Sequence, residues 1–162
     1  MSQPITVGIS DLNATKAPGV LVTYALGSCV GICLYDPMAK VAGLSHIMLP
    51  SGAQMAASGN QAYKFADTAI VLLIKKMEAL GARTIRMKAK IAGGAQMFAG
   101  GSNSNLANIG QRNVIAVKNE LARLRIPIIA EDTGKNYGRT LYLDANDGSM
   151  RIKSVNRGEW VW

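Results

Sequence analysis

The sequence predicts an α+β fold in which a mostly antiparallel sheet, or more than one such sheet, is covered by two main helices. Apolar segments of strand length outnumber the segments with helical spacing. Several of the strand-like segments follow each other closely, as in antiparallel hairpins, because parallel strands need a long crossover between them. Only two segments carry apolar residues at the three-and-four spacing of an amphipathic helix, and these are the two predicted helices.

The first half of the chain is predicted to contain five strands and one helix. The strands lie at 5–9, 19–24, 29–36, 41–49 and 83–91, and the helix lies at 61–80. The pair Asp36-Pro37 predicts a turn between the third and fourth strands. The helix is predicted from an apolar stripe that ends at Gly81. This stripe consists of Ala62, Phe65, Ala66, Ala69, Leu73, Met77 and Leu80.

The second half is predicted to contain the other helix and three further strands. The helix lies at 109–125, with strands at 128–132, 139–144 and 149–155. Its apolar face is Val114, Val117, Leu121 and Leu124. Asn146-Asp147-Gly148 predicts a hairpin turn between the last two strands. The segment 100–108 is rich in Gly, Ser and Asn and is predicted to be a loop.

The composition favours one domain spanning residues 1–162 in the cytoplasm. Hydrophobic residues make up 49% of the chain and charged residues 17%, which excludes a disordered chain. The longest aliphatic run, 69–74, is far shorter than the ~20 residues that span a bilayer, so no membrane insertion is expected. Asp11 and Lys16 interrupt the first twenty residues, which therefore do not read as a secretory signal.

The net charge of +8 favours an acidic partner. The densest basic stretch, Arg83, Arg86, Lys88 and Lys90, alternates with less polar residues and is typical of a strand with one solvated face. Aromatic residues amount to 6% and form no stacking platform among these charges. We therefore expect a solvated basic face rather than a nucleic-acid site, with an acidic protein surface as an open alternative.

The chain has one histidine, His46, and two cysteines, Cys29 and Cys33. A single histidine excludes a multi-histidine metal site, and the CxxxC spacing fits neither a redox motif nor a zinc knuckle. On one strand the two cysteines would lie about 13 Å apart, which is too far for a disulfide. The two thiols therefore have separate roles.

Hairpin geometry can bring His46 close to Cys29. If the strands on either side of the turn pair across a loop of even length, the two residues share a face of the sheet. A loop of two residues sets them directly opposite, and a loop of four makes them diagonal neighbours with Cα atoms ~7–8 Å apart. A loop of odd length would turn one of them away unless a bulge intervened.

A cysteine beside a histidine predicts nucleophilic chemistry. An adjacent imidazolium would lower the thiol pKa from about 8.5, so that the thiolate forms and His46 carries the proton. Gly27 permits a tight turn before the strand, so that backbone N–H groups near Ser28 and Cys29 can face a carbonyl oxygen. Thr23 is a candidate to orient the imidazole, and Asp36 and the asparagines are others. The alternative is that both cysteines and His46 are core residues.

The residues around Cys29 and His46 strongly resemble the chemoreceptor glutamine deamidase family, CheD, of bacterial and archaeal chemotaxis. The motifs that carry this resemblance are Leu26-Gly27-Ser28-Cys29-Val30, Asp36-Pro37, Gly43-Leu44-Ser45-His46-Ile47-Met48-Leu49-Pro50, Lys90-Ile91-Ala92-Gly93-Gly94-Ala95, Asn108-Ile109-Gly110 with Arg112-Asn113, and Ala130-Glu131-Asp132-Thr133-Gly134. The resemblance covers nearly the whole chain and is weakest after about Arg139, and the end with Trp160 and Trp162 departs from the family pattern.

The resemblance implies a cytoplasmic amidohydrolase that converts receptor glutamines to glutamates through a cysteine thioester. The family's nucleophile maps to Cys29, its histidine to His46 and its third catalytic residue to Thr23. The implied fold is an α/β sandwich similar to bacterial toxin deamidases, without cofactor or metal. The implied partners are the cytoplasmic domain of methyl-accepting chemoreceptors and a CheC-type phosphatase. A competing hypothesis is a non-catalytic basic module that binds nucleic acid or acts as a scaffold in a chemotaxis complex.

Overall fold

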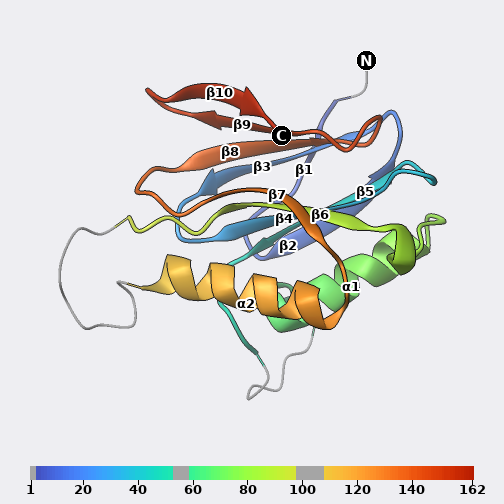
Figure 1. The fold of residues 1–162 in the computed structure, drawn as a ribbon, viewed down its shortest axis with the longest axis horizontal. Coiled ribbons are helices and arrows are strands. Elements are labelled where there is room, and N and C mark those ends of the chain that lie inside the picture. Colours follow the sequence, from blue (N-terminus) through green and yellow to red (C-terminus); the bar gives the residue numbers. More distant parts are fainter. Residues whose placement is uncertain (1–2, 53–58, 98–107) are drawn as a thin grey trace.

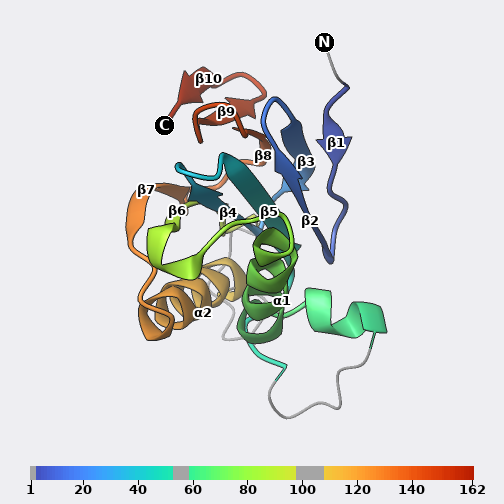
Figure 2. The ribbon, with the colours of Figure 1, turned by 90° about the vertical axis from the view of Figure 1, so that its right-hand side faces the viewer.

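The computed structural model of the protein describes residues 3–52, 59–97 and 108–162. Its strands form two sheets of five that pack face to face, and two helices cover the outer face of one sheet (Figures 1 and 2). Six strand pairings are antiparallel and two are parallel. The predicted α+β fold with mostly antiparallel strands is therefore confirmed.

The first sheet has the strand order β1-β3-β8-β9-β10 and lies farther from the helices (Figure 2). Its strands are β1 (Ile5–Thr6), β3 (Val20–Leu26), β8 (Arg139–Asp144), β9 (Met150–Ser154) and β10 (Gly158–Val161). The β3–β8 register shifts between Thr23 and Leu26, and Ala25 has a positive φ of 60° there. After this irregularity the chain leaves the first sheet and enters the second within three residues, 27–29.

The second sheet has the strand order β2-β5-β4-β6-β7 and forms the middle layer of the molecule. Its strands are β2 (Asp11–Lys16), β5 (Val41–Ile47), β4 (Val30–Asp36), β6 (Lys88–Gly93) and β7 (Ile128–Thr133). All the residues of β5 are buried, and so are all those of β4 except Tyr35. These two strands are enclosed because one face meets the first sheet and the other meets the helices.

The helices α1 (Ala66–Glu78) and α2 (Ile109–Arg123) each bury one stripe against the second sheet. Leu73 and Met77 of α1 and Val117 and Leu121 of α2 are fully buried in the core between helices and sheet. A second apolar core fills the space between the sheets and includes Leu21, Cys33, Leu44, Leu141 and Ile152. In the described part of the chain, neither helix is long and apolar enough to cross a membrane.

Several predicted boundaries differ from the observed ones. The predicted helix 61–80 divides into the 3-10 helix Gly59–Tyr63 and α1, and the predicted strand 83–91 begins with the 3-10 helix Thr84–Arg86. The predicted strand 5–9 is reduced to the two residues of β1. Most of the predicted loop at 100–108 lies outside the described residues.

The strands β2 and β10 were missed from the sequence. β2 contains Asp, Asn, Ala and Lys, residue types that are rare in strands, and it forms because its backbone pairs along β5. β10 is mostly exposed and pairs with β9 through all four of its residues. Pairing with a neighbouring strand, rather than apolar periodicity, defines both strands.

Candidate active site

The β4–β5 hairpin places Cys29 and His46 as diagonal neighbours. A four-residue loop, residues 37–40, joins the strands, and Gly31 pairs directly with His46. Cys29 immediately precedes β4, and extending the register by one pair places it opposite Met48. Cys29 and His46 therefore share the face that meets the first sheet, with Cα atoms roughly 7–8 Å apart. This is the four-residue alternative that the sequence left open.

Thr23 reaches His46 from the opposite sheet. Its hydroxyl oxygen lies 2.7 Å from Nδ1 of His46 and 2.6 Å from the carbonyl oxygen of Val7. A hydroxyl has one hydrogen, which it donates to Val7, so it accepts the hydrogen of Nδ1–H from His46. The neutral ring then carries its proton on Nδ1, and Nε2 has a free lone pair. The partner Val7 carries no sequence signal, because only the packing of the two sheets brings it to Thr23.

Nε2 of His46 is buried and has no hydrogen-bond partner among the residues that the structure describes. The ring itself is fully buried, whereas Cys29 is partly exposed. The Cys29 thiol is therefore on the same face but is not hydrogen-bonded to Nε2 in this structure. Catalytic hydrogen bonds are often long before substrate binds, and a cysteine side chain needs only a rotamer change to shorten one.

Burial holds both groups in their neutral forms. It raises the pKa of the Cys29 thiol, while the residue's own backbone N–H lowers it by a smaller amount. Burial also lowers the pKa of His46 to about 4. The expected thiolate–imidazolium pair is therefore wrong for the resting protein, since desolvation penalises both charged forms. What the site presents at neutral pH is a thiol beside a neutral imidazole with an unpaired basic nitrogen.

The carbonyl groups of the three residues before β4 each accept a hydrogen bond. The N–H of Ala95 donates to Gly27, a side-chain N–H of Asn113 donates to Ser28, and the N–H of Gly94 donates to Cys29. In a trans peptide the N–H points opposite to the preceding carbonyl. The N–H of Ser28 therefore points away from Ala95, and the N–H of Cys29 points away from Asn113.

Gly93 makes the close approach between β6 and the Cys29 segment possible. Its φ of +107° lies in the left-handed region, and an added Cβ would collide with the carbonyl oxygen of Cys29. In the next layer, an added Cβ on Gly110 of α2 would meet the carbonyl oxygens of Gly94 and Ala95. The segment 93–95 is thus packed tightly between the backbone of Cys29 and α2.

Asp36, the other named candidate to orient His46, lies at the far end of the hairpin. It pairs with Val41, five positions along β5 from His46. Its buried carboxylate accepts hydrogen bonds from the Arg86 guanidinium and from the N–H groups of Arg83, Met38 and Ala39. Burial alone would raise its pKa, but these donors outweigh it and lower the pKa to about 2. Asp36 therefore stabilises the turn and does not touch the imidazole.

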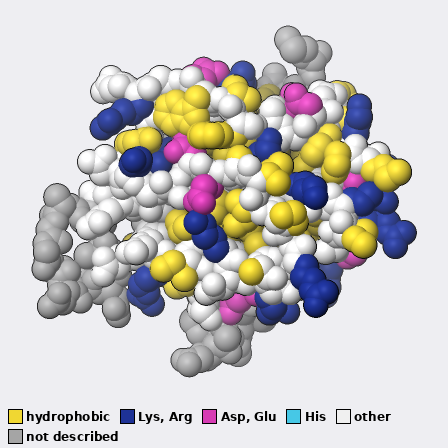
Figure 3. Space-filling view, viewed as in Figure 1, with side chains coloured by type: hydrophobic (Ala, Val, Ile, Leu, Met, Phe, Trp, Pro, Cys, Tyr) yellow, Lys and Arg dark blue, Asp and Glu magenta, His cyan; other side chains and the backbone are white. Residues whose placement is uncertain are grey.

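Two of the residues in the densest basic stretch have partners within the protein. Arg86 is engaged with Asp36, and the Lys90 ammonium donates to the carbonyl oxygens of Gly148 and Trp162. The face in Figure 3 shows Lys and Arg side chains dispersed among acidic and apolar ones. Within the described ranges 3–52, 59–97 and 108–162, no cluster of three or more His, Cys, Asp or Glu side chains is placed to hold a metal ion.

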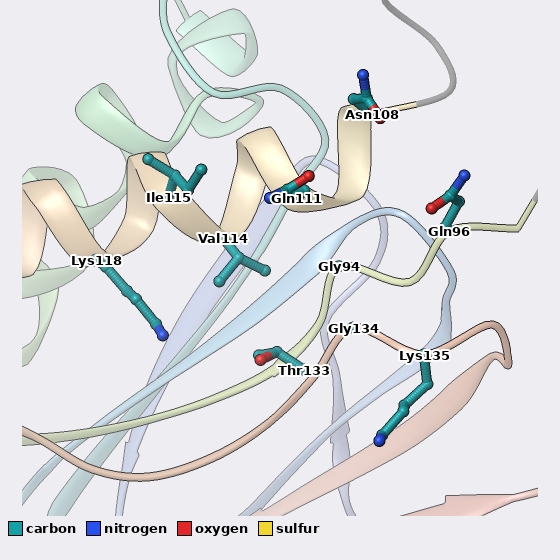
Figure 4. A pocket seen from close by; sticks show the side chains of 10 residues that line it. All are labelled: Gly94, Gln96, Asn108, Gln111, Val114, Ile115, Lys118, Thr133, Gly134 and Lys135. Atoms are coloured by element: carbon teal, nitrogen blue, oxygen red, sulfur yellow. The ribbon is translucent and has the colours of Figure 1, made fainter. Parts of the chain in front are cut away.

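A separate cavity of about 410 Å³ lies between α2 and the ends of β6 and β7. Figure 4 shows Val114 and Lys118 pointing from α2 toward Thr133 and Gly134, with Gln96 at the rim. Thr23, Cys29 and His46 do not line this cavity. Among its described lining residues, Gly94 links it to the site, because the N–H of Gly94 donates to the carbonyl oxygen of Cys29.

The end of the chain is integrated into the first sheet. Trp160 lies in β10, and its indole N–H donates to the carboxylate of Asp132 at 2.6 Å. The ring also meets Tyr137 edge to face. The buried Arg139 pairs with the same Asp132. The tail thus contributes to a structural cluster beside β7 and β8, away from the imidazole.

The family model and the curated relatives agree on one family. A family model described as CheD chemotactic sensory transduction matches residues 48–154, a range that begins after Thr23, Cys29 and His46. A protein of Caldanaerobacter subterraneus subsp. tengcongensis named "Probable chemoreceptor glutamine deamidase CheD" is 53% identical over 97% of this chain and 96% of its own length. A Clostridium botulinum protein (strain Alaska E43) with the same name is 54% identical over 95% of this chain and 94% of its own.

Two further comparisons differ in weight. The Halalkalibacterium halodurans protein named "Chemoreceptor glutamine deamidase CheD" is 48% identical over 98% of each chain. A crystal structure of a Neisseria meningitidis protein of the family model DUF152 is 9% identical, covers 81% of this chain and 64% of that one, and has a TM-score of 0.49. Sequence similarity over nearly full length, rather than this weak structural likeness, establishes the relationship.

Proposed function

The chain belongs to the CheD family of chemotactic sensory transduction proteins, and on that premise we propose that it deamidates glutamine side chains of chemoreceptors to glutamates. The observation that carries the proposal is the hydrogen bond between Thr23 and His46. This bond leaves the basic Nε2 of the only histidine on the face that carries Cys29. Hydrolysis by a cysteine nucleophile requires the nucleophile, a base and a group that orients the base.

The first half of the reaction forms a thioester. The Cys29 sulfur attacks the carboxamide carbon, its proton passes to Nε2 of His46, and the carbonyl electrons move onto oxygen. The N–H groups of Ser28 and Cys29 hold that oxyanion, an aid typically worth a factor of ~10²–10³. His46 then gives the proton to the amide nitrogen, the carbon–nitrogen bond breaks, and ammonia leaves.

The second half restores the enzyme. Nε2 of His46 takes a proton from water, whose oxygen attacks the thioester carbon. The carbon–sulfur bond breaks, His46 returns the proton to the sulfur, and the product leaves as a carboxylic acid that loses its own proton to solvent. Because the resting pair is neutral, His46 acts as a general base during the attack, a contribution typically worth ~10²–10⁴. Thr23 stabilises the transient imidazolium by accepting from Nδ1–H.

The proposed setting is the cytoplasm, where the substrate is the cytoplasmic domain of a methyl-accepting chemoreceptor and a CheC-type phosphatase is a regulator. The charge of +8 supports an acidic protein partner. The dispersed basic side chains on the face in Figure 3 do not favour a nucleic acid.

The decisive experiment incubates the protein with a receptor cytoplasmic fragment and follows the fragment by mass spectrometry. Each conversion replaces an amide NH₂ by OH, which raises the mass and releases one ammonia. We expect both signals with the parent protein and neither with Cys29→Ala. A Cys33→Ala variant, which removes the other thiol, should retain the activity. Binding to the receptor without conversion would instead favour the non-catalytic scaffold.

A further inference from the structure

Asn113 occupies an unusual position for a polar side chain. It lies in the second turn of α2 and is fully buried. Its side-chain amide nitrogen donates to the carbonyl oxygen of Ser28 at 3.0 Å and to that of Met48 at 2.9 Å. Ser28 directly precedes Cys29, and Met48 lies two residues after His46. One amide group therefore contacts both segments that carry the proposed catalytic pair.

The orientation of this amide is fixed by its partners. Both acceptors are carbonyl oxygens, so only the NH₂ end can face them. The oxygen Oδ1 of Asn113 is then left buried without a hydrogen-bond partner among the described residues. A buried acceptor without a hydrogen bond costs unfolding free energy, so a residue at position 113 with no unpaired polar atom would give a more stable fold. The placement is better explained by what the NH₂ group holds.

The amide replaces hydrogen bonds that the sheet cannot make at this point. The paired register of β4 and β5 ends at Val30 and Ile47. Beyond it the N–H of Met48 turns to the carbonyl of Lys64, so the two strands no longer pair where Cys29 faces Met48. Asn113 bridges the segment before β4 and the segment after β5 across this opening, with one amide hydrogen on each.

We infer that Asn113 is a positioning residue that sets the orientation of the nucleophile segment, an inference that rests on the proposed deamidase function. By holding the Ser28 carbonyl toward α2, it turns the N–H of Cys29, which belongs to the same peptide, to the opposite side. The same bridge fixes the spacing between the Cys29 segment and the end of β5. Asn113 thus acts on turnover through Cys29 and its N–H, without touching the substrate.

The test compares Asn113→Ala with Leu121→Ala. Leu121 is fully buried two turns farther along α2, so its truncation weakens the fold without touching the Cys29 segment. We expect kcat on a receptor fragment to fall roughly 10- to 100-fold for Asn113→Ala, with KM within a few-fold, because catalytic geometry is lost rather than binding. For Leu121→Ala we expect kcat within about twofold of the parent after correction for the folded fraction.

Alkylation by iodoacetamide supplies a second readout in the same samples. A loosened segment should expose Cys29, whose labelling rate rises several-fold while turnover falls, and the buried Cys33 should stay protected. Labelling of both thiols in Asn113→Ala would mean that the variant is unfolded. Asn113→Ser, which keeps one donor, then replaces it, and we expect a smaller loss of kcat and a smaller rise in the Cys29 labelling rate. Equal kcat losses in the Asn113 and Leu121 variants, or a normal kcat without Asn113, would overturn the inference.

The proposed function fails by a different result. If Cys29→Ala still deamidates the receptor, the chemistry assigned to Cys29 is wrong, whatever Asn113 does. If Cys29→Ala is inactive and Asn113→Ala turns over normally, only the positioning role is wrong.

Discussion

The Thr23 hydroxyl joins the two sheets through His46, at 2.7 Å from Nδ1, and is itself anchored to the carbonyl of Val7. Thr23 and His46 are fully buried. Because the hydroxyl donates to Val7, it can only accept from the imidazole, which selects the tautomer with a free Nε2. The hydrogen bond therefore determines both the direction of the ring and the atom that can act as a base.

Replacing Thr23 by valine should reduce kcat by roughly 10- to 100-fold, because the tautomer and the ring orientation are no longer fixed. Valine keeps the branched shape but leaves the Val7 carbonyl and His46 Nδ1 unpaired, which should also cost about 1–3 kcal/mol of unfolding free energy. Thr23→Ser, which retains the hydroxyl, is the matched control and should keep most of the turnover. Equal kcat values for the valine variant and the parent would remove Thr23 from the mechanism.

Iodoacetamide should label Cys29 well before Cys33 at every pH tested. Cys29 is partly exposed, whereas Cys33 is buried and its pKa lies far above the ordinary range because of desolvation, only partly offset by Lys90. Since burial also raises the pKa of Cys29, its labelling rate should climb steadily from pH 6.5 past pH 8.5. Peptide mapping after timed quenching measures both rates. A fast Cys29 labelling rate at pH 6.5 that does not increase at higher pH would instead support a thiolate–imidazolium pair in the resting protein.

The stability of the protein should depend on His46 between pH 6.5 and about pH 4. The folded-state pKa is lowered to about 4, so in this range the unfolded chain binds a proton that the folded protein does not. The contribution of His46 to the unfolding free energy should therefore be constant above pH 6.5 and fall by about 1.4 kcal/mol per pH unit below it. Urea unfolding at pH 7.5, 5.5 and 4.5 measures this slope.

The control for this pH dependence is His46→Asn, in which an amide N–H can still face Thr23. His46 is the only histidine in the chain, so the difference between parent and variant isolates its titration. The difference in unfolding free energy between the parent and His46→Asn should become smaller as the pH falls, or the variant should become the more stable of the two, because the parent loses stability. Parallel curves across the range would mean that burial does not hold His46 neutral.

Asp36→Asn should weaken the fold without lowering kcat. The change removes the charge that pairs with Arg86 in a buried position and should cost about 2–4 kcal/mol of unfolding free energy. Because the pKa of Asp36 is lowered to about 2, its stabilising effect is complete above pH 4 and is lost as the pH falls toward 2. Denaturant unfolding and receptor turnover of the same preparation check both parts. A large loss of kcat at unchanged stability would place Asp36 in the mechanism.

Salt should weaken deamidation of the receptor mainly through KM. A protein of net charge +8 attracts an acidic partner, and charges more than ~10 Å apart are screened at 0.1 M salt. We expect KM on a receptor fragment to rise from low to high salt with kcat unchanged. A short uncharged peptide containing glutamine is the control and should show no such rise. A flat KM on the receptor fragment would show that charge does not steer the encounter.

The alternation of apolar residues and the length of one turn allowed much of this site to be predicted. The strand 139–144 was predicted with its exact bounds, and the start of α2 was also correct. The four residues between β4 and β5 fix the parity of the hairpin, so the sequence alone restricted Cys29 and His46 to one face for an even loop. These features are local, because each depends on residues that are neighbours along the chain.

Only the tertiary structure decided among the candidates to orient His46. Thr23 and Asp36 were both available in the sequence, and the packing of one sheet on the other brings Thr23 to Nδ1 and leaves Asp36 with Arg86. The same packing desolvates Cys29 and His46 and makes their resting pair neutral, against the charged pair that sequence proximity predicted. The sequence thus determined which chemical groups can share a face, because strand register is local. Which of them touch, and in which protonation state, depends on burial between segments far apart in the chain.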